Sequence, residues 1–336
     1  MNNEIRYIKE SEYHEWDDFV HNHPDGSVFH CSYWLKNLFD SLSAKIEFRI
    51  ICIFDKNGNI LGGFAFGIKK AGGILSILFP PPNTLYWNIL VSSRDTKYQG
   101  KNISYKRELI QSILNIMEDD LDIINFIVPN STFDIRPYTW KGYFQKVLYT
   151  YILKIDDLDS TYDLFDPSLK RQIKKGERSN YNINSGNNQD LAETFLKLQS
   201  LSFDRQSKSF SFQEKNFLKF IASIRDIVNL QFYIIYQENK PVYGISLLID
   251  KNIAYYWLAG GDPDFFDTGL NQLLLWNIIK DLKEKDIKYF DFVGTNTESI
   301  TNYKSKYNFT LTPYYALSKQ VGWKAKSLMF LKNLKK

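Results

Sequence analysis

The sequence predicts an α/β (α+β) protein in which one unit occurs twice in tandem. Segments with the period of a strand alternate with segments of helical period along the chain, and the order hairpin, helix, strand recurs in both halves. With 336 residues, 44% of them hydrophobic, the chain can bury two cores. We therefore expect two units, residues 1–160 and 161–336, each with a mixed, mostly antiparallel sheet flanked by helices.

Each half contains a hairpin of similar form. The stretch "FRIICIFDKNGNILGGFAFGI" places an Asp-Lys-Asn-Gly turn between two apolar strands, and "LQFYIIYQENKPVYGISLLID" places Glu-Asn-Lys-Pro at the same point. Gly62 and Gly244 occupy similar places in the second strand of each hairpin. The two hairpins therefore suggest two copies of one unit.

A helix and then a strand follow each hairpin. The stretch "SYKRELIQSILNIMEDDLDIINFIVP" predicts a helix and a strand over 123–128, and "NQLLLWNIIKDLKEKDIKYFDFVG" predicts the same with a strand over 289–293. The second helix has an apolar face at helical spacing, formed by Leu270, Leu273, Leu274, Ile278 and Leu282.

The segment between the copies is distinct in charge. A strand over 149–155 closes the first unit, an acidic link follows, and a basic helix begins near Ser168, a suitable N-cap residue. We place the boundary near residue 160 for this reason. Helices over 190–203 and 212–224 are predicted before the second hairpin.

Composition excludes several classes of protein. A net charge of +4 is too small for a dedicated nucleic-acid binder, although residues 170–178 carry five cations and residues 319–336 carry six lysines. Two cysteines and four histidines predict neither a disulfide framework nor a structural zinc site. A polar N-terminus and the absence of an apolar run of 18 residues predict a cytoplasmic protein. The basic C-terminal helix either docks on its own domain or contacts the inner face of a membrane.

Four stretches together resemble one family. They are "PSLKRQIKKGERSNYNI", "FDIRPYTWKGYFQKVLYTYILKI", "YYWLAGGDP" and "FDFVGTNTESITNYKSKYNF". Taken together they resemble the GNAT acyltransferase superfamily in its doubled, Fem-type form, the family of the enzymes that form peptidoglycan bridges. The resemblance covers residues from about Val28 to Leu317.

The resemblance implies an N-acyltransferase with no permanently bound cofactor and no metal. Acyl-CoA is the implied co-substrate, and the acceptor is an amine of a cell-envelope precursor, such as an amino sugar in surface polysaccharide biosynthesis. An aminoacyl-tRNA donor with a peptidoglycan precursor as acceptor is the alternative, so the implied partners are a small or lipid-linked sugar or peptide and, in that alternative, tRNA. A third possibility is a GNAT-fold binding protein without catalysis, because fold alone does not fix function.

The resemblance also assigns residues to a site in the second unit. The position of the family's phosphate-binding loop reads "GGDPDFFDTGLNQ", which implies cofactor binding by Gly260, Gly261 and Gly269, although the spacing differs and an arginine is missing. Lys304 matches the family's lysine, which meets acceptor phosphates or the transferring carbonyl. Arg205 matches an arginine near the acceptor, and a role in a salt bridge is the alternative interpretation.

The remaining candidates come from the residues themselves. Asp291 lies inside an apolar strand, so it is either a base with a raised pKa or a structural hydrogen-bond acceptor. Tyr255 and Trp257 alternate on one face of their strand, where they line the cleft or pack in the core. Tyr303 and Lys306 flank Lys304 and complete the predicted substrate site, for which a solvated helix is the alternative interpretation.

Overall fold

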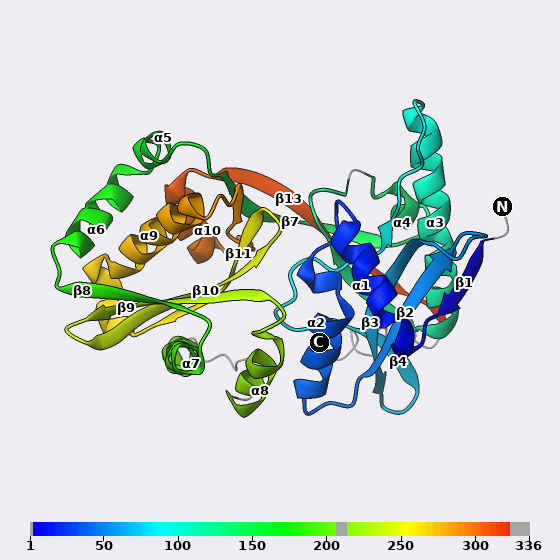
Figure 1. The fold of residues 1–336 in the computed structure, drawn as a ribbon, viewed down its shortest axis with the longest axis horizontal. Helices are drawn as coiled ribbons and strands as arrows, with labels where there is room; N and C mark the ends of the chain where they lie inside the picture. The colour runs from blue at the N-terminus through cyan, green and yellow to red at the C-terminus, as the bar shows by residue number, and fades with distance from the viewer. Residues whose placement is uncertain (1–2, 133, 206–213, 323–336) are drawn as a thin grey trace, which may run out of the picture. The chain divides into compact units, whose positions relative to one another are not determined.

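The computed structural model describes residues 3–132, 134–205 and 214–322 (Figure 1). Their contacts divide the chain into two compact units: unit 1 holds the described residues up to Val147 and from Tyr314 on, and unit 2 holds Leu148–Pro313. Both divisions fall inside strands, β7 (Phe144–Lys154) and β13 (Thr310–Gln320). The boundary that we expect near residue 160 would separate two copies of one folding pattern, and it stays a prediction. The contacts assign the last strand, β13, to unit 1 from Tyr314 on.

Unit 1 is built on a mixed sheet in the strand order β1-β2-β3-β4-β6-β13, with β5 paired to β3. All its described pairings are antiparallel except that of β4 with β6. The strands are β1 (Glu4–Tyr7), β2 (Glu47–Phe54), β3 (Ile60–Ala71), β4 (Leu75–Phe79), β5 (Leu90–Val91) and β6 (Ile123–Val128). The helices are η1 (Glu10–Glu12), α1 (Tyr13–Asn22), η2 (Val28–His30), α2 (Ser32–Ser41), α3 (Gln99–Asp120) and α4 (Arg136–Thr139).

Unit 2 repeats this plan in the strand order β7-β12-β11-β10-β9-β8. Here β11 and β12 are the parallel pair, and the other described pairings are antiparallel. The strands are β8 (Tyr181–Gly186), β9 (Asn229–Gln237), β10 (Lys240–Asp250), β11 (Ile253–Gly261) and β12 (Tyr289–Asp291). The helices are α5 (Leu158–Asp163), α6 (Pro167–Glu177), α7 (Gln189–Arg205), α8 (Glu214–Ile224), η3 (Pro263–Thr268), α9 (Leu270–Glu284), α10 (Glu298–Lys304) and η4 (Ser305–Tyr307).

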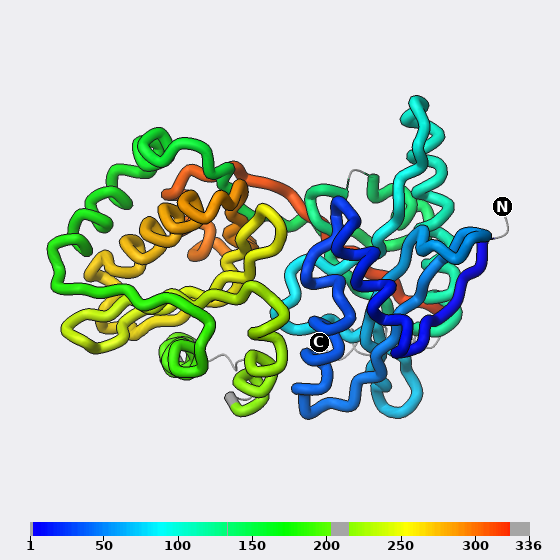
Figure 2. The backbone as a smooth tube through the Cα atoms, viewed as in Figure 1, coloured from blue at the N-terminus to red at the C-terminus, as the bar shows by residue number. Residues whose placement is uncertain are grey.

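The predicted fold class and the repeated order of elements are confirmed. The chain passes from a hairpin through a further strand, a helix and a parallel strand in both units: β2, β3, β4, α3, β6 in one and β9, β10, β11, α9, β12 in the other (Figure 2). The predicted apolar face of α9 is buried, and the hairpin turn at Glu238 and Asn239 takes positive φ at both residues. Strand β4, a short apolar segment of unit 1, was not predicted.

Two local predictions were wrong in detail. Helix α6 is capped by Asp166, whose carboxylate accepts a hydrogen bond from the Ser168 amide, so Ser168 is not the N-cap. Pro167 at the first helical position explains the shift, because a proline there has no amide to satisfy. The predicted strand over 289–293 ends at Asp291, because Val293 has a φ of 52° that no strand accommodates.

Both cores are rich in aromatic residues. In unit 2 the faces of β10, β11 and β12 pack against α9 through a buried cluster that includes Phe290, Phe292, Tyr307 and Phe309. In unit 1, α1 and α2 approach β3 so closely that only glycine fits: a Cβ on Gly63 would lie 2.6 Å from Trp16, and one on Gly67 would lie 2.7 Å from Phe39. No helix in the described part of the chain is long and apolar enough to cross a lipid bilayer.

Candidate functional site

The strands β11 and β12 separate in the middle of unit 2. They pair in parallel only up to Tyr255 and Asp291, where β12 ends, while β11 continues to Gly261. The register of β11 with β10 shifts at the same point, because Tyr256 and Leu258 face neighbouring residues of β10 and Trp257 is the extra residue of a β-bulge. On the β12 side, residues 256–261 therefore pair with no strand in the described part of the chain. At the end of this edge, the Gly261 amide donates to the Ser202 hydroxyl of α7 at 2.9 Å, and that hydroxyl donates to the Gly261 carbonyl at 3.1 Å, so the open part of the edge is residues 256–260. An extended ligand can bind such a strand edge through the backbone.

A strained turn lies directly after β12. Val293 has a φ of 52° and Gly294 a φ of 60°, and a β-branched residue in this region carries backbone strain. The carboxylate of Asp291 holds the turn, accepting hydrogen bonds from the Val293 amide at 2.8 Å and from the Thr150 hydroxyl at 2.5 Å. Asp291 is 1% exposed and Thr150 is fully buried. The described contacts of Asp291 are thus those of a structural acceptor.

Lys304 fixes the same turn from the other side. Its ammonium donates to the carbonyl oxygens of Phe292, Val293 and Gly294 at 2.6, 2.7 and 2.8 Å. Burial lowers the pKa of Lys304 to about 8, although the negative charge of Asp291 acts in the opposite direction. A lysine has three donors, and these three bonds use them all. In this arrangement the ammonium has no proton left for the substrate phosphates or carbonyl that the resemblance implies for it.

Four tyrosines surround the Lys304 side chain and the end of β11. Tyr303 and Tyr307 bring their hydroxyls within 3.2 Å, and the ring of Tyr256 has its centre 5.6 Å from the Lys304 ammonium. The ring of Tyr243 packs on Gly261 so closely that a Cβ there would lie 2.2 Å from it. Burial raises the pKa of all four phenols, so they are neutral proton donors near neutral pH. We call Tyr243, Tyr256, Tyr303 and Tyr307 the tyrosine cluster.

Tyr255 and Trp257 lie apart from the tyrosine cluster. The ring of Trp257 stacks on Phe217 of α8, and both β11 side chains are almost fully buried. Burial, aided by the Asp291 carboxylate beside it, raises the pKa of Tyr255. Their described surroundings are those of core residues.

The three predicted cofactor glycines each permit a close approach within the fold. A Cβ on Gly260 would lie 2.3 Å from the Cα of Gln199 in α7, and Gly261 is covered by Tyr243. Gly269 is the N-cap of α9 with a φ of 85°, and a Cβ there would lie 2.1 Å from the Gln172 carbonyl of α6. Packing therefore accounts for all three glycines without a phosphate.

The N-terminus of α9 is covered by α6. Gly176 meets Gly269 at the crossing, and Lys175 donates to the Asp267 carbonyl at 2.6 Å. The preceding loop also carries Asp264 and Asp267, whose charges disfavour a pyrophosphate.

The remaining predicted residues lie at the margins of the described structure. Lys306 is exposed in η4, and its carbonyl accepts a bond from the Asp166 amide. Arg205 ends α7, but its side chain lies outside the described residues, as does the basic C-terminal segment from 323. Within the described residues, no three His, Cys, Asp or Glu side chains gather where they could hold a metal ion.

The site contains residues that the sequence did not single out. Tyr243 of β10 and Tyr307 of η4 complete the tyrosine cluster, and Thr150 of β7 reaches Asp291. Nothing in the neighbouring sequence marks Tyr243 and Thr150, because their contacts join segments far apart in the chain. One signal was present: Tyr307 lies three residues after Lys304, within one turn of a helix.

Comparison with known proteins agrees with the fold. Residues 167–305 match the family model described as acetyltransferase (GNAT) domain. The search of curated proteins found no match.

Solved structures with the same fold cover nearly the whole chain at low sequence identity. The crystal structure of FemX aligns with a TM-score of 0.66 and 12% identity over 93% of this chain and 96% of that one. The C-terminal domain of a putative lysylphosphatidylglycerol synthetase from Agrobacterium fabrum aligns with a TM-score of 0.57 and 13% identity over 95% and 94%. A tandem GNAT protein from the clavulanic acid biosynthesis pathway aligns with a TM-score of 0.56 and 9% identity over 95% and 99%. The chain therefore shares its fold with FemX and with the tandem GNAT protein, and its residues 167–305 match the acetyltransferase (GNAT) domain.

Proposed function

We propose that the protein transfers an acyl group from acyl-CoA to an amine of a cell-envelope precursor, such as an amino sugar of a surface polysaccharide. The observation that carries this proposal is the separation of β11 from β12 after Tyr255 and Asp291. Crevices at the carboxyl ends of strands are the usual ligand sites of open α/β sheets. The free edge of β11 would hold the pantetheine arm of the donor through backbone hydrogen bonds.

In the proposed reaction the amine nitrogen forms a bond to the thioester carbonyl carbon, and the carbon–sulfur bond breaks. The amine loses a proton and the leaving thiolate gains one. Backbone amides of β11 between Tyr256 and Gly260 would stabilise the oxyanion, and a neutral phenol of the tyrosine cluster would donate the proton to sulfur. Tyr256 is our candidate for this donor, because it lies at the point where the strands separate.

In this proposal Asp291 and Lys304 act as positioning residues. Together they fix the backbone from Phe292 to Gly294 beside the separating strands. A rigid turn there would hold the acceptor amine in line with the carbonyl. Such positioning supplies a large part of the rate acceleration when two bound molecules react. Tyr303, next to Lys304 in the chain, would contact the acceptor from the same side as this turn.

The class of acceptor rests on the relatives. FemX and a domain of a putative lysylphosphatidylglycerol synthetase share this fold, and the second name describes an aminoacylated lipid. An envelope precursor that bears a free amine is consistent with these relatives. The reaction would take place in the cytoplasm, or at the inner membrane face when the acceptor is lipid-linked.

A second donor is favoured by one specific observation. The N-terminus of α9, where a GNAT enzyme would bind pyrophosphate by resemblance, is covered by α6 and preceded by Asp264 and Asp267. The side chains of Arg171 and Lys174 on α6, and of Arg178 at its C-cap, are exposed and cationic. This arrangement supports an aminoacyl-tRNA donor and a peptidoglycan precursor as acceptor, because exposed cations bind a nucleic-acid backbone.

The two donors are separated by a direct titration. Calorimetry with acetyl-CoA and CoA should give micromolar dissociation constants if acyl-CoA is the donor. No binding at millimolar concentration would remove that donor, and transfer from a charged tRNA to an amine acceptor would then be measured. Binding of a donor without any transfer to a panel of amino sugars, peptides and aminolipids would contradict the proposed activity and indicate a protein that only binds.

A further inference from the structure

Unit 1 contains a pocket of about 320 Å³ where its own parallel strands part. Strands β4 and β6 share a single described register pair, Ile77 with Ile123. Strand β4 then ends at Phe79, still paired with β3, whereas β6 continues to Val128. The same relation of strands opens the candidate site of unit 2. The volume lies at the lower end of the range for small-molecule sites, about 300–1,000 Å³.

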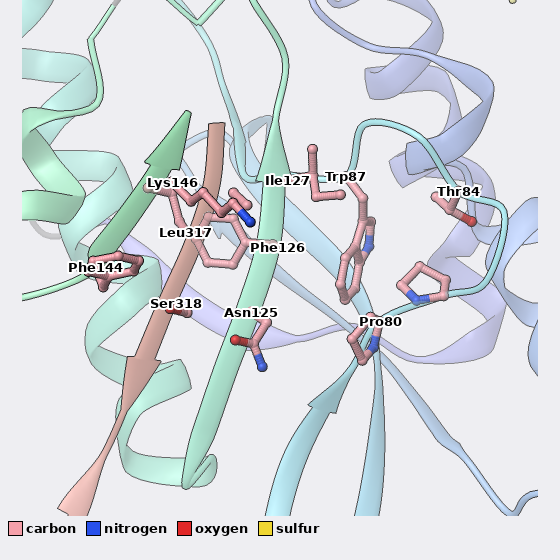
Figure 3. Close-up of a pocket in the computed structure, with 12 residues that line it drawn as sticks. Pro80, Thr84, Trp87, Asn125, Phe126, Ile127, Phe144, Lys146, Leu317 and Ser318 are labelled. Carbon is pink, nitrogen blue, oxygen red and sulfur yellow. The ribbon is translucent and has the colours of Figure 1, made fainter. Parts of the chain in front are cut away.

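The floor of the pocket is one face of two paired strands. Asn125 and Ile127 of β6 lie opposite Ser318 and Ala316 of β13, and all four line the cavity (Figure 3). Three of the four side chains, those of Asn125, Ala316 and Ser318, are small or polar and leave the sheet surface open.

The wall of the pocket is rigid. Pro80 and Pro81 have restricted backbones, and the Trp87 indole is fixed by a bond of 2.8 Å from Nε1 to the Ala65 carbonyl. The Trp87 amide also donates to the Ile127 carbonyl at 2.9 Å, which ties the wall to the floor. A cavity held in this way is formed before a ligand arrives, which lowers the entropy lost on binding.

The opposite side of the pocket combines an exposed ring with a cationic side chain. Phe144 and Lys146 lie two residues apart on β7, and Phe144 is 70% exposed. Figure 3 shows the Lys146 side chain reaching across β13 toward the end of β6. Within the described residues, the side chains of Lys146, Asn125 and Ser318 have no hydrogen-bond or ion-pair partner. A mostly apolar pocket with a few convergent polar groups is the usual form of a ligand site.

We propose that this pocket binds a small organic anion with a compact apolar body, such as an aryl or branched-chain carboxylate. The body lies between the prolines, Trp87 and Phe144, and the carboxylate pairs with Lys146 and accepts from the Asn125 amide or the Ser318 hydroxyl. A cationic or neutral ligand of the same shape leaves Lys146 unpaired and binds less well. The proposal concerns unit 1 by itself and does not depend on the reaction proposed for unit 2.

The test uses three probes that share one ring. Ligand-observed ¹⁹F NMR on the full chain would measure 4-fluorobenzoate, 4-fluorobenzyl alcohol and 4-fluorobenzylammonium. We expect millimolar or tighter binding of the benzoate, at least about fivefold weaker binding of the alcohol, and still weaker binding of the ammonium.

Substitutions of two exposed residues, with one control, separate the contribution of the charge to binding from that of the aromatic ring. Lys146→Met should abolish the preference for the anion while the alcohol still binds, and Phe144→Ala should weaken both by about threefold or more. Lys56→Met, which removes an exposed lysine on the β2–β3 turn, should change neither. Circular dichroism checks that each variant is folded. Absence of benzoate binding at about 10 mM, or benzoate affinity that both pocket variants leave unchanged, would overturn the proposal.

Discussion

The ammonium of Lys304 lies 2.8 Å from the carbonyl oxygen of Gly294, a residue with a φ of 60°. Two further bonds to Phe292 and Val293 make this one side chain the clamp of the strained turn after β12. The clamp relates the stability of unit 2 to the geometry of its candidate site.

Replacing Lys304 by Met should therefore cost both stability and activity. Three carbonyls lose their donor, so we expect the free energy of unfolding to fall by about 2–4 kcal/mol. Once the acceptor is known, kcat/KM for it should fall at least about tenfold, or about 1.4 kcal/mol, because the turn is no longer fixed. Urea unfolding measures the first effect. Lys306→Ala is the matched control, since that side chain is exposed, and an equal effect of the two substitutions would refute the clamp.

The depressed pKa of Lys304 predicts the direction of a pH dependence. Its folded-state pKa of about 8 lies below the ordinary 10.5, so between these values the unfolded chain binds more protons. Stability from this group therefore rises with pH across that window. Between about pH 7.5 and 9.5, the wild type should gain on the order of 1–2 kcal/mol relative to Lys304→Met. Parallel stability profiles for the two proteins would show that the lysine is not buried in this way.

Thr150 should matter through its hydroxyl alone. Thr150→Val keeps the shape but leaves the buried Asp291 carboxylate without the bond of 2.5 Å. We expect a loss of about 1–3 kcal/mol in the free energy of unfolding, whereas Thr150→Ser, which retains the hydroxyl, should lose less. Chemical denaturation of the three proteins tests this order. If the valine variant were as stable as the wild type, the hydrogen bond would contribute nothing to the free energy of unfolding.

Gly260 should tolerate no side chain. Its Cβ would lie 2.3 Å from a backbone atom of α7, so Gly260→Ala must displace that helix and should lower the melting temperature by several degrees. Gly100→Ala is the control, because no atom of the described residues lies within 4 Å of the place that its new methyl group would take and α3 favours alanine over glycine. Calorimetry should find Gly100→Ala at least as stable as the wild type. A destabilisation by Gly100→Ala equal to that of Gly260→Ala would contradict the packing explanation.

The repeated architecture could be predicted because local patterns determine it. The hairpins carry turn residues between apolar strands, and α9 carries an apolar face over five positions, so period and turn chemistry were enough. The β-bulge at Trp257 could not be predicted, because it depends on the pairing of β10 with β11 and leaves no mark in the order of residues.

The candidate site was predicted only in part because it is assembled from distant segments. Lys304 and Tyr303 were identified as a pair, yet the direction of the Lys304 ammonium depends on where the carbonyls of 292–294 point. Gly260 and Gly269 have the residue type of a phosphate loop, and only the structure shows α7 and α6 packed against them. Sequence can select residue types, whereas the partner of each side chain follows from tertiary packing.

The central claim is that the acyl donor binds along the edge of β11. Hydrogen–deuterium exchange of the full chain, followed in peptides of unit 2 with each donor, tests this claim most directly. Peptides covering residues 256–261 and 291–294 should gain protection when acetyl-CoA, or a charged tRNA, is added, because the donor would bond to the free edge of β11. The same peptides should not respond to an unrelated nucleotide such as ATP. Transfer of the acyl group without any change in these peptides would contradict the claim and move the reaction to another part of the protein.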